Sequence, residues 1–552
     1  MRSAFLSISI LLCSTWVFAA APPPAEGNKG MVASDHELSS AAGAIVLDQG
    51  GNAVDAMIAT VLAAGVVQPA GSGLGGGGFA VWHDTKDGYG TLDFREVAPS
   101  QATRDMFSKS QLNNASQDGG LAVAVPGEGQ GLIELHRRFG SRPLRELALP
   151  AIELAKRGFS VGPQLAKSFA RLDDPNGFTA QFLGIEQAPQ RGDHIERPRL
   201  AKAIKAWVKT EGRALVDGWV AQDWVSTAKK SGGILEVSDI VANQPREREP
   251  VVGSYRGWKV VSMAPPSSGG VVLLQVLKVL EASELSKMGH NSAELLHLYV
   301  ETMQHAFADR AHFMGDPDRV EVPVEDLLCE DRIEAVRAAF DAEKTLSAEE
   351  YGAPVDAGND AGTQHISIID KNGFAVALTT TINTTFGSKV VGEKSGVVLN
   401  NQMDDFVAQP GAPNAYGLVG SEANAVAPGA VPLSSMSPTI LVSPDGTQRI
   451  AIGASGGPFI ITSTLQSIIN IIDFEMNPSE AVSAPRVHHQ WQPRQIFLDV
   501  GISSDTESLL IEKGHKVTHF EHYSSVQVVH WDGEIFRGAS DPRKGGWPVG
   551  VR

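Results

Sequence analysis

A threonine at position 363 follows a stretch of small and polar residues and opens an apolar segment. Residues 354–362 read Pro-Val-Asp-Ala-Gly-Asn-Asp-Ala-Gly, which is the composition of an exposed loop. A threonine inside a chain is a poor nucleophile because its hydroxyl needs a base, and no sequence neighbour supplies one. Cleavage of the Gly362–Thr363 bond would free an α-amino group, whose pKa of roughly 8 suits a general base near neutral pH. The ordinary alternative is a threonine that packs at a strand edge.

The residues after Thr363 predict a β-hairpin. Two alternating runs, 366–369 and 374–378, are separated by Asp-Lys-Asn-Gly, and Asn-Gly between such runs is a strong turn signal. The hairpin places Thr363 at the beginning of one strand. Thr381 and Asn383 then follow the end of the partner strand, where Thr381 can reach the hydroxyl of Thr363.

Longer patterns predict a layered α/β fold, because strand-forming segments alternate with amphipathic helices. Helices are expected at 52–67, 292–314 and about 460–472. A strand is expected at 79–83, and strands at 396–400 and 449–453 are expected to extend the first hairpin. The N-terminal half is helix-rich, whereas the part from Thr363 onward is mostly short β segments.

Further motifs follow in a characteristic order along the chain. They are Gly-Gly-Asn-Ala-Val-Asp-Ala at 50–56, Gly-Gly-Gly-Gly-Phe at 75–79, Asp-Phe-Arg-Glu at 93–96, Pro-Pro-Ser-Ser-Gly-Gly at 265–270, Thr-Gln-His-Ile-Ser at 363–367, Thr-Thr-Thr-Ile-Asn at 379–383, Phe-Gly at 386–387, Pro-Leu-Ser-Ser-Met-Ser-Pro at 432–438, Gly-Ala-Ser-Gly-Gly-Pro at 453–458 and Ser-Asp-Pro-Arg at 540–543. From about Gly30 to the C-terminus, the chain resembles the γ-glutamyltranspeptidase family. Gln364 departs from the family pattern, which usually has Thr or Ser after the nucleophile.

The resemblance implies the architecture and the maturation of the chain. The expected fold is that of an N-terminal-nucleophile hydrolase, a four-layer αββα sandwich. A proenzyme would cleave itself at Gly362–Thr363 into a large subunit, 22–362, and a small subunit, 363–552. The two subunits would remain together as a heterodimer.

The resemblance also implies roles for individual residues. It assigns Thr363 as nucleophile with Thr381 in support, Gly456 and Gly457 to an oxyanion hole, Arg95, Ser434 and Ser435 to a substrate α-carboxylate, Asn383, Gln402 and Asp405 to the α-ammonium, and Tyr416 to a lid. These residue types suit those roles, since a guanidinium grips a carboxylate at two points and backbone N–H groups stabilise an oxyanion. The plainer alternatives are a surface ion pair for Arg95 and ordinary turns for the serine and glycine pairs.

The implied activity is that of a γ-glutamyl hydrolase and transferase. It would take the γ-glutamyl group from glutathione and related donors and pass it to water, amino acids or peptides. A β-lactam side-chain acylase of the same superfamily is the alternative activity. A non-catalytic secreted binding protein on this fold is the alternative from another class.

Two patterns that could hold a cofactor have a different explanation. Gly-Ser-Gly-Leu-Gly-Gly at 71–76 matches a dinucleotide fingerprint, but it follows a predicted helix and precedes a strand, the reverse of what that motif requires. His488 and His489 are adjacent and face opposite ways in an extended segment, with no further ligand at metal spacing. No cofactor and no metal are predicted.

Composition bounds the partners and the location. A net charge of −17 argues against binding to nucleic acid or to anionic membranes, and no stable membrane association is expected. Residues 1–21 predict a cleavable secretory signal, cut between Ala19 and Ala21, so the protein is expected to be secreted, or periplasmic if bacterial. Cys329 would then be the single cysteine, and a buried, inert thiol is expected.

Overall fold

The computed structural model describes residues 21–85, 88–108, 110, 114–174, 177–351, 362–407, 421–520 and 524–552. The predicted lid residue Tyr416 and the first twenty residues of the predicted signal lie outside these ranges. Strand β10 (Gly362–Asp370) runs through the Gly362–Thr363 bond, so the structure is that of the uncut chain.

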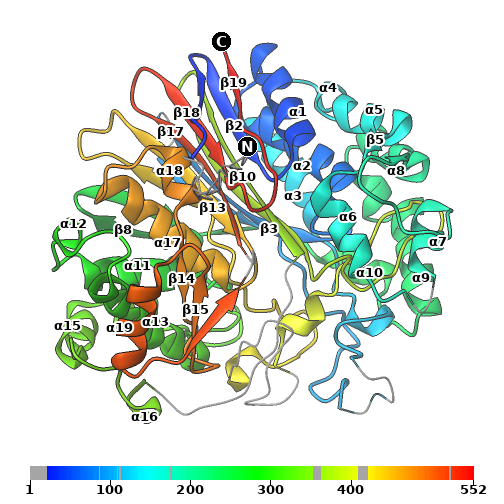
Figure 1. The fold of residues 1–552 in the computed structure, drawn as a ribbon. Coiled ribbons are helices and arrows are strands. Elements are labelled where there is room, and N and C mark those ends of the chain that lie inside the picture. Colours follow the sequence, from blue (N-terminus) through cyan, green and yellow to red (C-terminus); the bar gives the residue numbers. More distant parts are fainter. Residues whose placement is uncertain are drawn as a thin grey trace, which may run out of the picture.

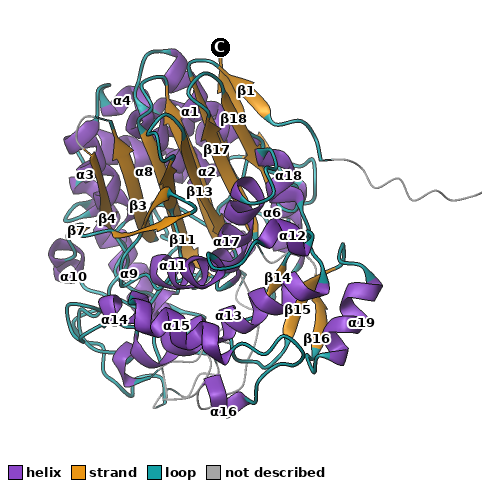
Figure 2. Cartoon of the chain, turned by 90° about the vertical axis from the view of Figure 1, so that its left-hand side faces the viewer, coloured by secondary structure: helices purple, strands orange, loops and turns teal. Residues whose placement is uncertain are grey.

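Two antiparallel seven-stranded sheets form the centre of the molecule (Figure 2). In sheet order, the first consists of β19 (Val549–Val551), β2 (Gly30–Ser34), β10, β11 (Ala375–Asn383), β3 (Gly77–Asp84), β4 (Gly88–Asp93) and β7 (Arg246–Arg248). The second consists of β1 (Ala25–Gly27), β18 (Phe536–Ser540), β17 (Ser525–Trp531), β13 (Arg449–Ser455), β12 (Thr439–Val442), β9 (Trp258–Ser262) and β8 (Val251–Tyr255). Two smaller sheets are β14 (Val487–His488), β15 (Ile496–Asp499) and β16 (Val517–Phe520), and β5 (Phe159–Ser160) with β6 (His194–Ile195).

Helices cover the outer face of each large sheet (Figure 1). The helices on the side of the first sheet are α1 (Glu37–Asp48), α2 (Ala53–Val67), α3 (Glu128–Phe139), α4 (Leu144–Leu147), α5 (Leu149–Arg157), α6 (Pro163–Ala170), α7 (Phe178–Leu183), α8 (Pro198–Lys209), α9 (Trp219–Lys230) and α10 (Val237–Ala242). Those on the side of the second sheet are α11 (Gly269–Leu280), α12 (Leu285–Met288), α13 (Ala293–Phe313), α14 (Val324–Leu328), α15 (Glu330–Ala339), α16 (Ala348–Tyr351), α17 (Phe459–Ile472), α18 (Pro478–Ser483) and α19 (Ser504–Glu512). The predicted αββα sandwich is therefore confirmed.

The hairpin strands bury both faces because they lie in the middle of the sandwich. Ile366 and Ile368 belong to the apolar core under α1 and α2, whereas Ile369 and Ala377 belong to the core between the sheets. This alternation follows the period of two along a strand. β10 pairs with β2 on one side and β11 on the other, and the register sets Thr363 opposite Thr381.

The predicted helices and the predicted hairpin are confirmed. Helix α2 begins after Asn52, whose side chain forms a capping box with Asp55, and it ends before Gln68. Helices α13 and α17 match the other two predicted segments within a residue or two. The glycines after α2 allow the backbone of this segment to lie close to β11. A side-chain carbon at Gly76 would lie only 2.0 Å from the carbonyl oxygen of Thr381.

Three expectations were wrong. Residues 396–400 form no strand beyond a single bridge at Val398, because the N–H of Asn400 turns to the carbonyl of Gly75. Strand β13 exists, but it pairs with β12 and β17 in the other sheet, so it does not extend the hairpin. Cys329 is exposed, because it lies on the surface between the short helices α14 and α15.

Candidate active site

Thr363 is buried at the start of β10, a central strand of the first sheet, and contacts the second predicted threonine. The two hydroxyl oxygens of Thr363 and Thr381 are 3.0 Å apart. The Thr381 hydroxyl also lies 2.8 Å from the carbonyl oxygen of Gly362, to which it donates, and it accepts the N–H of Asn383 at 2.8 Å. The peptide bond that precedes Thr363 is therefore hydrogen-bonded by the threonine that stands opposite it in the hairpin.

Two glycines connect β13 to α17 beside Thr363. Gly456 and Gly457 have φ values of 126° and 57°, a region that favours glycine. Within the described part of the chain, neither of their N–H groups donates a hydrogen bond. Both residues share a pocket wall with Thr363. Two unused backbone donors close to a hydroxyl are the arrangement that an oxyanion hole requires.

Arg95 and Asp405 form a close ion pair. Arg95 follows β4 and is 1% exposed, and its guanidinium lies 2.6 Å from the Asp405 carboxylate. Glu96 lies on the other side, 3.6 Å from the same guanidinium, and neither of its oxygens has a hydrogen-bond partner among the described residues. Burial raises the pKa of Glu96 to about 8 in spite of Arg95, so this carboxyl is mostly protonated at neutral pH.

Besides the Glu96 oxygens, two more buried polar atoms that line the pocket near this ion pair have no hydrogen-bond partner among the residues described. They are the amide oxygen of Gln402, which is an acceptor, and the hydroxyl of Ser435. The amide nitrogen of Gln402 donates to Asp405 at 2.7 Å, so its oxygen is held in place. Buried polar atoms without partners are rare in folded proteins, and at a pocket they indicate a ligand. One acceptor and one hydroxyl suit a ligand that carries both an ammonium and a carboxylate.

Two pockets meet at Thr363. The first, called here the donor pocket, is lined by Arg95, Arg310, Thr363, Thr381, Asn383, Gln402, Asp405, Leu433, Ser434, Ser435, Met436, Gly457 and Ile460. It unites every predicted site residue in the described ranges except Gly362 and Gly456, which line the second pocket with Thr363. The neighbouring Asp404, in the same 3₁₀ turn, accepts a hydrogen bond from Ser116 at 2.6 Å and is not among the lining residues.

The sequence did not point to several residues at this site. Arg310 of α13 is buried in the donor pocket and donates to Ser268 at 2.9 Å, and burial lowers its pKa to about 10. Lys544 contacts the Thr363 carbonyl from the C-terminal segment. In the sequence, only the motif at 540–543 drew attention to the segment next to Lys544. The periodic pattern of α13 did not distinguish Arg310 from the other polar residues of that helix.

The histidines do not contribute to this site. The ring nitrogens of His488 bond to Thr462 at 2.8 Å and Gln490 at 2.9 Å. His297, Glu301 and His515 form a buried group with suitable spacing for a metal. Its members already form hydrogen bonds within the protein. Nδ1 of His297 lies 2.7 Å from Nε2 of His515, and the Thr345 hydroxyl donates to Glu301 at 2.7 Å.

Solved structures identify the class of protein. A cephalosporin acylase from Bacillus halodurans superposes with a TM-score of 0.87 at 25% identity, and the match covers 99% of this chain and 100% of that one. A γ-glutamyltranspeptidase chain from Helicobacter pylori matches with a TM-score of 0.55 at 36% identity, covering 58% of this chain and 93% of that one. Together with the sandwich and the threonine at its edge, these matches define an N-terminal-nucleophile hydrolase fold.

Sequence comparison then identifies the family. The family model described as gamma-glutamyltranspeptidase matches residues 39–551. The glutathione hydrolase proenzyme of Escherichia coli is 39% identical over 567 residues, with 98% of this chain and 97% of that protein covered. A proenzyme of the same name from Pseudomonas sp. is 38% identical, with 99% and 96% covered. The chain belongs to the γ-glutamyltranspeptidase family.

Proposed function

We propose that Thr363 is the nucleophile of a γ-glutamyl hydrolase and transferase that acts on glutathione and related donors. Membership of the family supports the γ-glutamyl chemistry, and relatives named glutathione hydrolase proenzymes support the donor. The observation that carries the proposal is the polarity of the donor pocket. Arg95 and Ser435 offer donors to an α-carboxylate, whereas Gln402 and Asp405 offer acceptors to an α-ammonium.

The proposed reaction has two steps. The Thr363 hydroxyl oxygen bonds to the γ-carbonyl carbon, and the free α-amino group of the cleaved Thr363 takes the hydroxyl proton and passes it to the leaving nitrogen as the amide bond breaks. Gly456 and Gly457 donate their N–H groups to the carbonyl oxygen while it carries negative charge. Water or an acceptor amine then attacks the ester carbon, and Thr363 regains its hydroxyl proton.

The same hydroxyl is proposed to release itself from the uncut chain. Attack by Thr363 on the Gly362 carbonyl carbon converts the peptide bond to an ester, which water hydrolyses. The hydrogen bond of 2.8 Å from Thr381 to the Gly362 oxygen supports this step, because it stabilises charge on that oxygen. The products are the large subunit, 22–362, and the small subunit, 363–552.

The two products are proposed to stay together as a heterodimer. Strands β10 and β11 of the small subunit lie between β2 and β3 of the large subunit, so separation would break the centre of a sheet. The H. pylori chain also supports processing, since 93% of that chain covers only 58% of this one, a share typical of a separate large subunit. Secretion, into the periplasm if the source is bacterial, is proposed from the apolar residues 4–18. No helix in the described ranges is both long and apolar enough to cross a bilayer.

The acylase activity is the second candidate, because the cephalosporin acylase has the same fold over the whole chain. The donor pocket favours the γ-glutamyl donor. An acyl group without an α-ammonium would leave the Asp405 carboxylate and the Gln402 oxygen without a cationic partner from the ligand.

Denaturing electrophoresis with a γ-glutamyl-4-nitroanilide assay tests the proposal. The purified protein should run as two bands, and N-terminal sequencing of the smaller should read Thr-Gln-His-Ile-Ser. Thr363→Ala should remain one chain without activity, because the attacking hydroxyl is gone. An active enzyme that runs as a single uncut band, or an active Thr363→Ala variant, would refute the proposed role of Thr363.

A further inference from the structure

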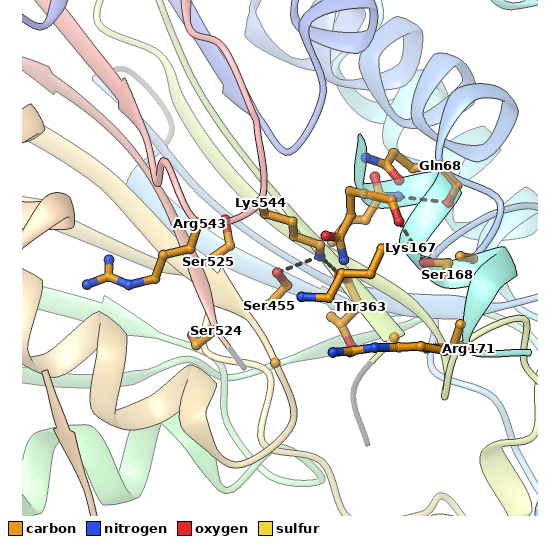
Figure 3. A pocket seen from close by; sticks show the side chains of 17 residues that line it. Gln68, Lys167, Ser168, Arg171, Thr363, Ser455, Ser524, Ser525, Arg543 and Lys544 are labelled. Carbon is orange, nitrogen blue, oxygen red and sulfur yellow. Dashed lines mark hydrogen bonds between the residues drawn. The ribbon is translucent and has the colours of Figure 1, made fainter. Parts of the chain in front are cut away.

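The second pocket beside Thr363, called here the α6 pocket, lies on the side away from the donor pocket. Its cavity volume is about 80 Å³, and it opens between α6 and the C-terminal segment (Figure 3). Thr363 and Gly456 line this pocket, whereas Thr363 and Gly457 line the donor pocket. An amide carbonyl held at the two glycines therefore has its acyl side in the donor pocket and its nitrogen side in the α6 pocket.

Four cationic side chains line the α6 pocket, and two of them are already paired. Arg543 bonds to Asp499 at 2.6 Å and points away from Thr363 (Figure 3). The Lys544 ammonium lies 3.1 Å from Asp35 and 2.8 Å from Ser455, and it also donates to the Thr363 carbonyl. These two cations have structural partners.

Lys167 and Arg171 are different, since neither side chain forms a hydrogen bond or ion pair with any described residue. Lys167 is half-buried and Arg171 is exposed, and both belong to the α6 side of the pocket (Figure 3). They stand four residues apart, so they lie on the same face of the helix, where like charges repel. The dipole of the helix favours cations in its last turn, which offsets part of this repulsion.

Packing of Phe169 fixes the α6 helix, and with it the backbone that carries these two cations. Phe169 is buried and its ring centre lies 4.8 Å from that of Phe386, which follows β11. Among the described residues that line the α6 pocket, none is acidic, although the whole chain carries a charge of −17. The positive charge of this wall is therefore a local feature, and it suits an anion that reaches Thr363.

We propose that Lys167 and Arg171 bind a carboxylate on the amine side of the scissile bond. The ligand class is a peptide with a free terminal carboxylate, either the peptide that leaves the donor or the peptide that accepts the γ-glutamyl group. This inference rests on the proposed function, because it assumes that the acyl side occupies the donor pocket. On this proposal, Lys167 and Arg171 of the large subunit give the enzyme a preference for leaving groups that carry a carboxylate.

A matched pair of chromogenic donors tests the proposal. γ-Glutamyl-3-carboxy-4-nitroanilide and γ-glutamyl-4-nitroanilide differ only by a carboxylate on the leaving group. Their intrinsic reactivities differ, but that difference cancels when the ratio of their kcat/KM values is compared between enzyme variants. The double variant Lys167→Ala/Arg171→Ala should lower this ratio by roughly 3- to 10-fold, as expected for two partly solvated charge contacts. Its rate on the plain anilide should match that of the parent.

Two further variants sharpen the test. Lys167→Glu reverses the charge and should lower the ratio more than Lys167→Ala does. Lys205→Ala removes an exposed lysine from α8 and should leave the ratio unchanged. Raising the salt concentration should lower the ratio for the parent and not for the double variant, because exposed charges are screened.

The outcomes separate this inference from the proposed function. If the double variant is processed, cleaves the plain anilide normally and keeps the parental ratio, the carboxylate site is wrong while the proposed function stands. If the parent cleaves neither anilide, the proposed function itself is wrong. A ratio that Lys167→Glu leaves unchanged also contradicts the carboxylate site.

Discussion

The donor pocket and the α6 pocket differ in the burial and pairing of their charged side chains, although Thr363 lines both. In the donor pocket, Arg95 and Asp405 are almost fully buried and 2.6 Å apart. In the α6 pocket, Lys167 is half-buried, Arg171 is exposed, and neither has a partner among the described residues. A buried charge is stable only when it is paired, whereas a solvated charge needs no partner. If the two pockets bind the substrate as proposed, this difference predicts strong selection of the γ-glutamyl end and weak selection of the amine end.

The buried ion pair between Arg95 and Asp405 also determines which charged groups a donor must carry to bind there. Arg95 and Asp405 form an ion pair with each other, so a γ-glutamyl group bound as proposed would replace one ion pair with two. A ligand with a carboxylate alone would take Arg95 and leave Asp405 buried without a cation. If the donor binds as proposed, the pocket should select a zwitterion, which is the form of a γ-glutamyl group.

The largest expected effect comes from a donor that lacks the amine. γ-Glutamyl anilide and glutaryl anilide differ only in the α-ammonium, and a site with unpaired polar groups rejects the lacking analogue by roughly 10⁴-fold. Measured kcat/KM values for the two substrates test this expectation. Equal values would mean that Asp405, Gln402 and Asn383 form no ammonium site, and the acylase would become the better proposal.

Asp405→Ala should have the next largest effect. It removes the carboxylate beside Arg95, and loss of a buried partner of this kind costs about 2–5 kcal/mol, or roughly 30- to 4,000-fold in kcat/KM. Asp404→Ala is the matched control, because that neighbouring carboxylate bonds to Ser116 outside the donor pocket. If both variants are processed and lose activity equally, Asp405 has no specific role toward the donor.

Arg95→Lys should weaken donor binding less. The substitution keeps the charge but loses the planar fork, which corresponds to about 1.5–3 kcal/mol for a hydrogen bond to a charged group. Arg104→Lys is the control, since Arg104 forms a similar fork with Glu422 on the surface, at 2.8 and 3.1 Å. The expected result is a raised KM for γ-glutamyl anilide in Arg95→Lys alone. An unchanged KM would exclude a two-point contact between Arg95 and the donor carboxylate.

The sequence predicted local elements well because their signals are local. The Asn-Gly turn and the alternating residues define β10 and β11, and the capping residues of α2 define its start. Partners of distant strands carry no such signal, and β13 was assigned to the wrong sheet for that reason. The prediction that Cys329 is buried was wrong. It followed from the usual burial of cysteines, and nothing in the sequence of the short helices on either side indicated that this residue is exposed.

The candidate site shows the same difference between what local sequence signals predict and what depends on long-range packing. The resemblance to a family brought together residues from Arg95 to Gly457, which no periodicity could have done. It left out Arg310, and it left out the cations of α6, whose proximity to Thr363 arises only when α6 packs on Phe386. Long-range packing of this kind is invisible to spacing and composition.

The last expected effect is one on folding stability and not on catalysis, and it concerns Glu96, the second carboxyl beside Arg95. Its pKa is raised to about 8 in the folded protein, mainly by burial, whereas an unfolded glutamate titrates near its ordinary value of roughly 4.3. The folded chain thus binds more protons than the unfolded chain between these two values. The stability from this group is fully present at low pH and is lost as pH rises toward 8, by up to about 1.4 kcal/mol per pH unit.

Glu96→Gln removes this titration, so its stability relative to the parent should grow as pH rises from 5 to 8. Urea midpoints measured in the uncut Thr363→Ala chain would show the trend without subunit dissociation. Glu128→Gln gives the comparison, because burial raises the pKa of Glu128 to about 7, and its gain should level off one pH unit earlier. Lys167→Ala, in the solvated α6 pocket, should show no trend in this range. A constant difference between Glu96→Gln and the parent would mean that Glu96 is ionised throughout, and that Arg95 lies between two carboxylates.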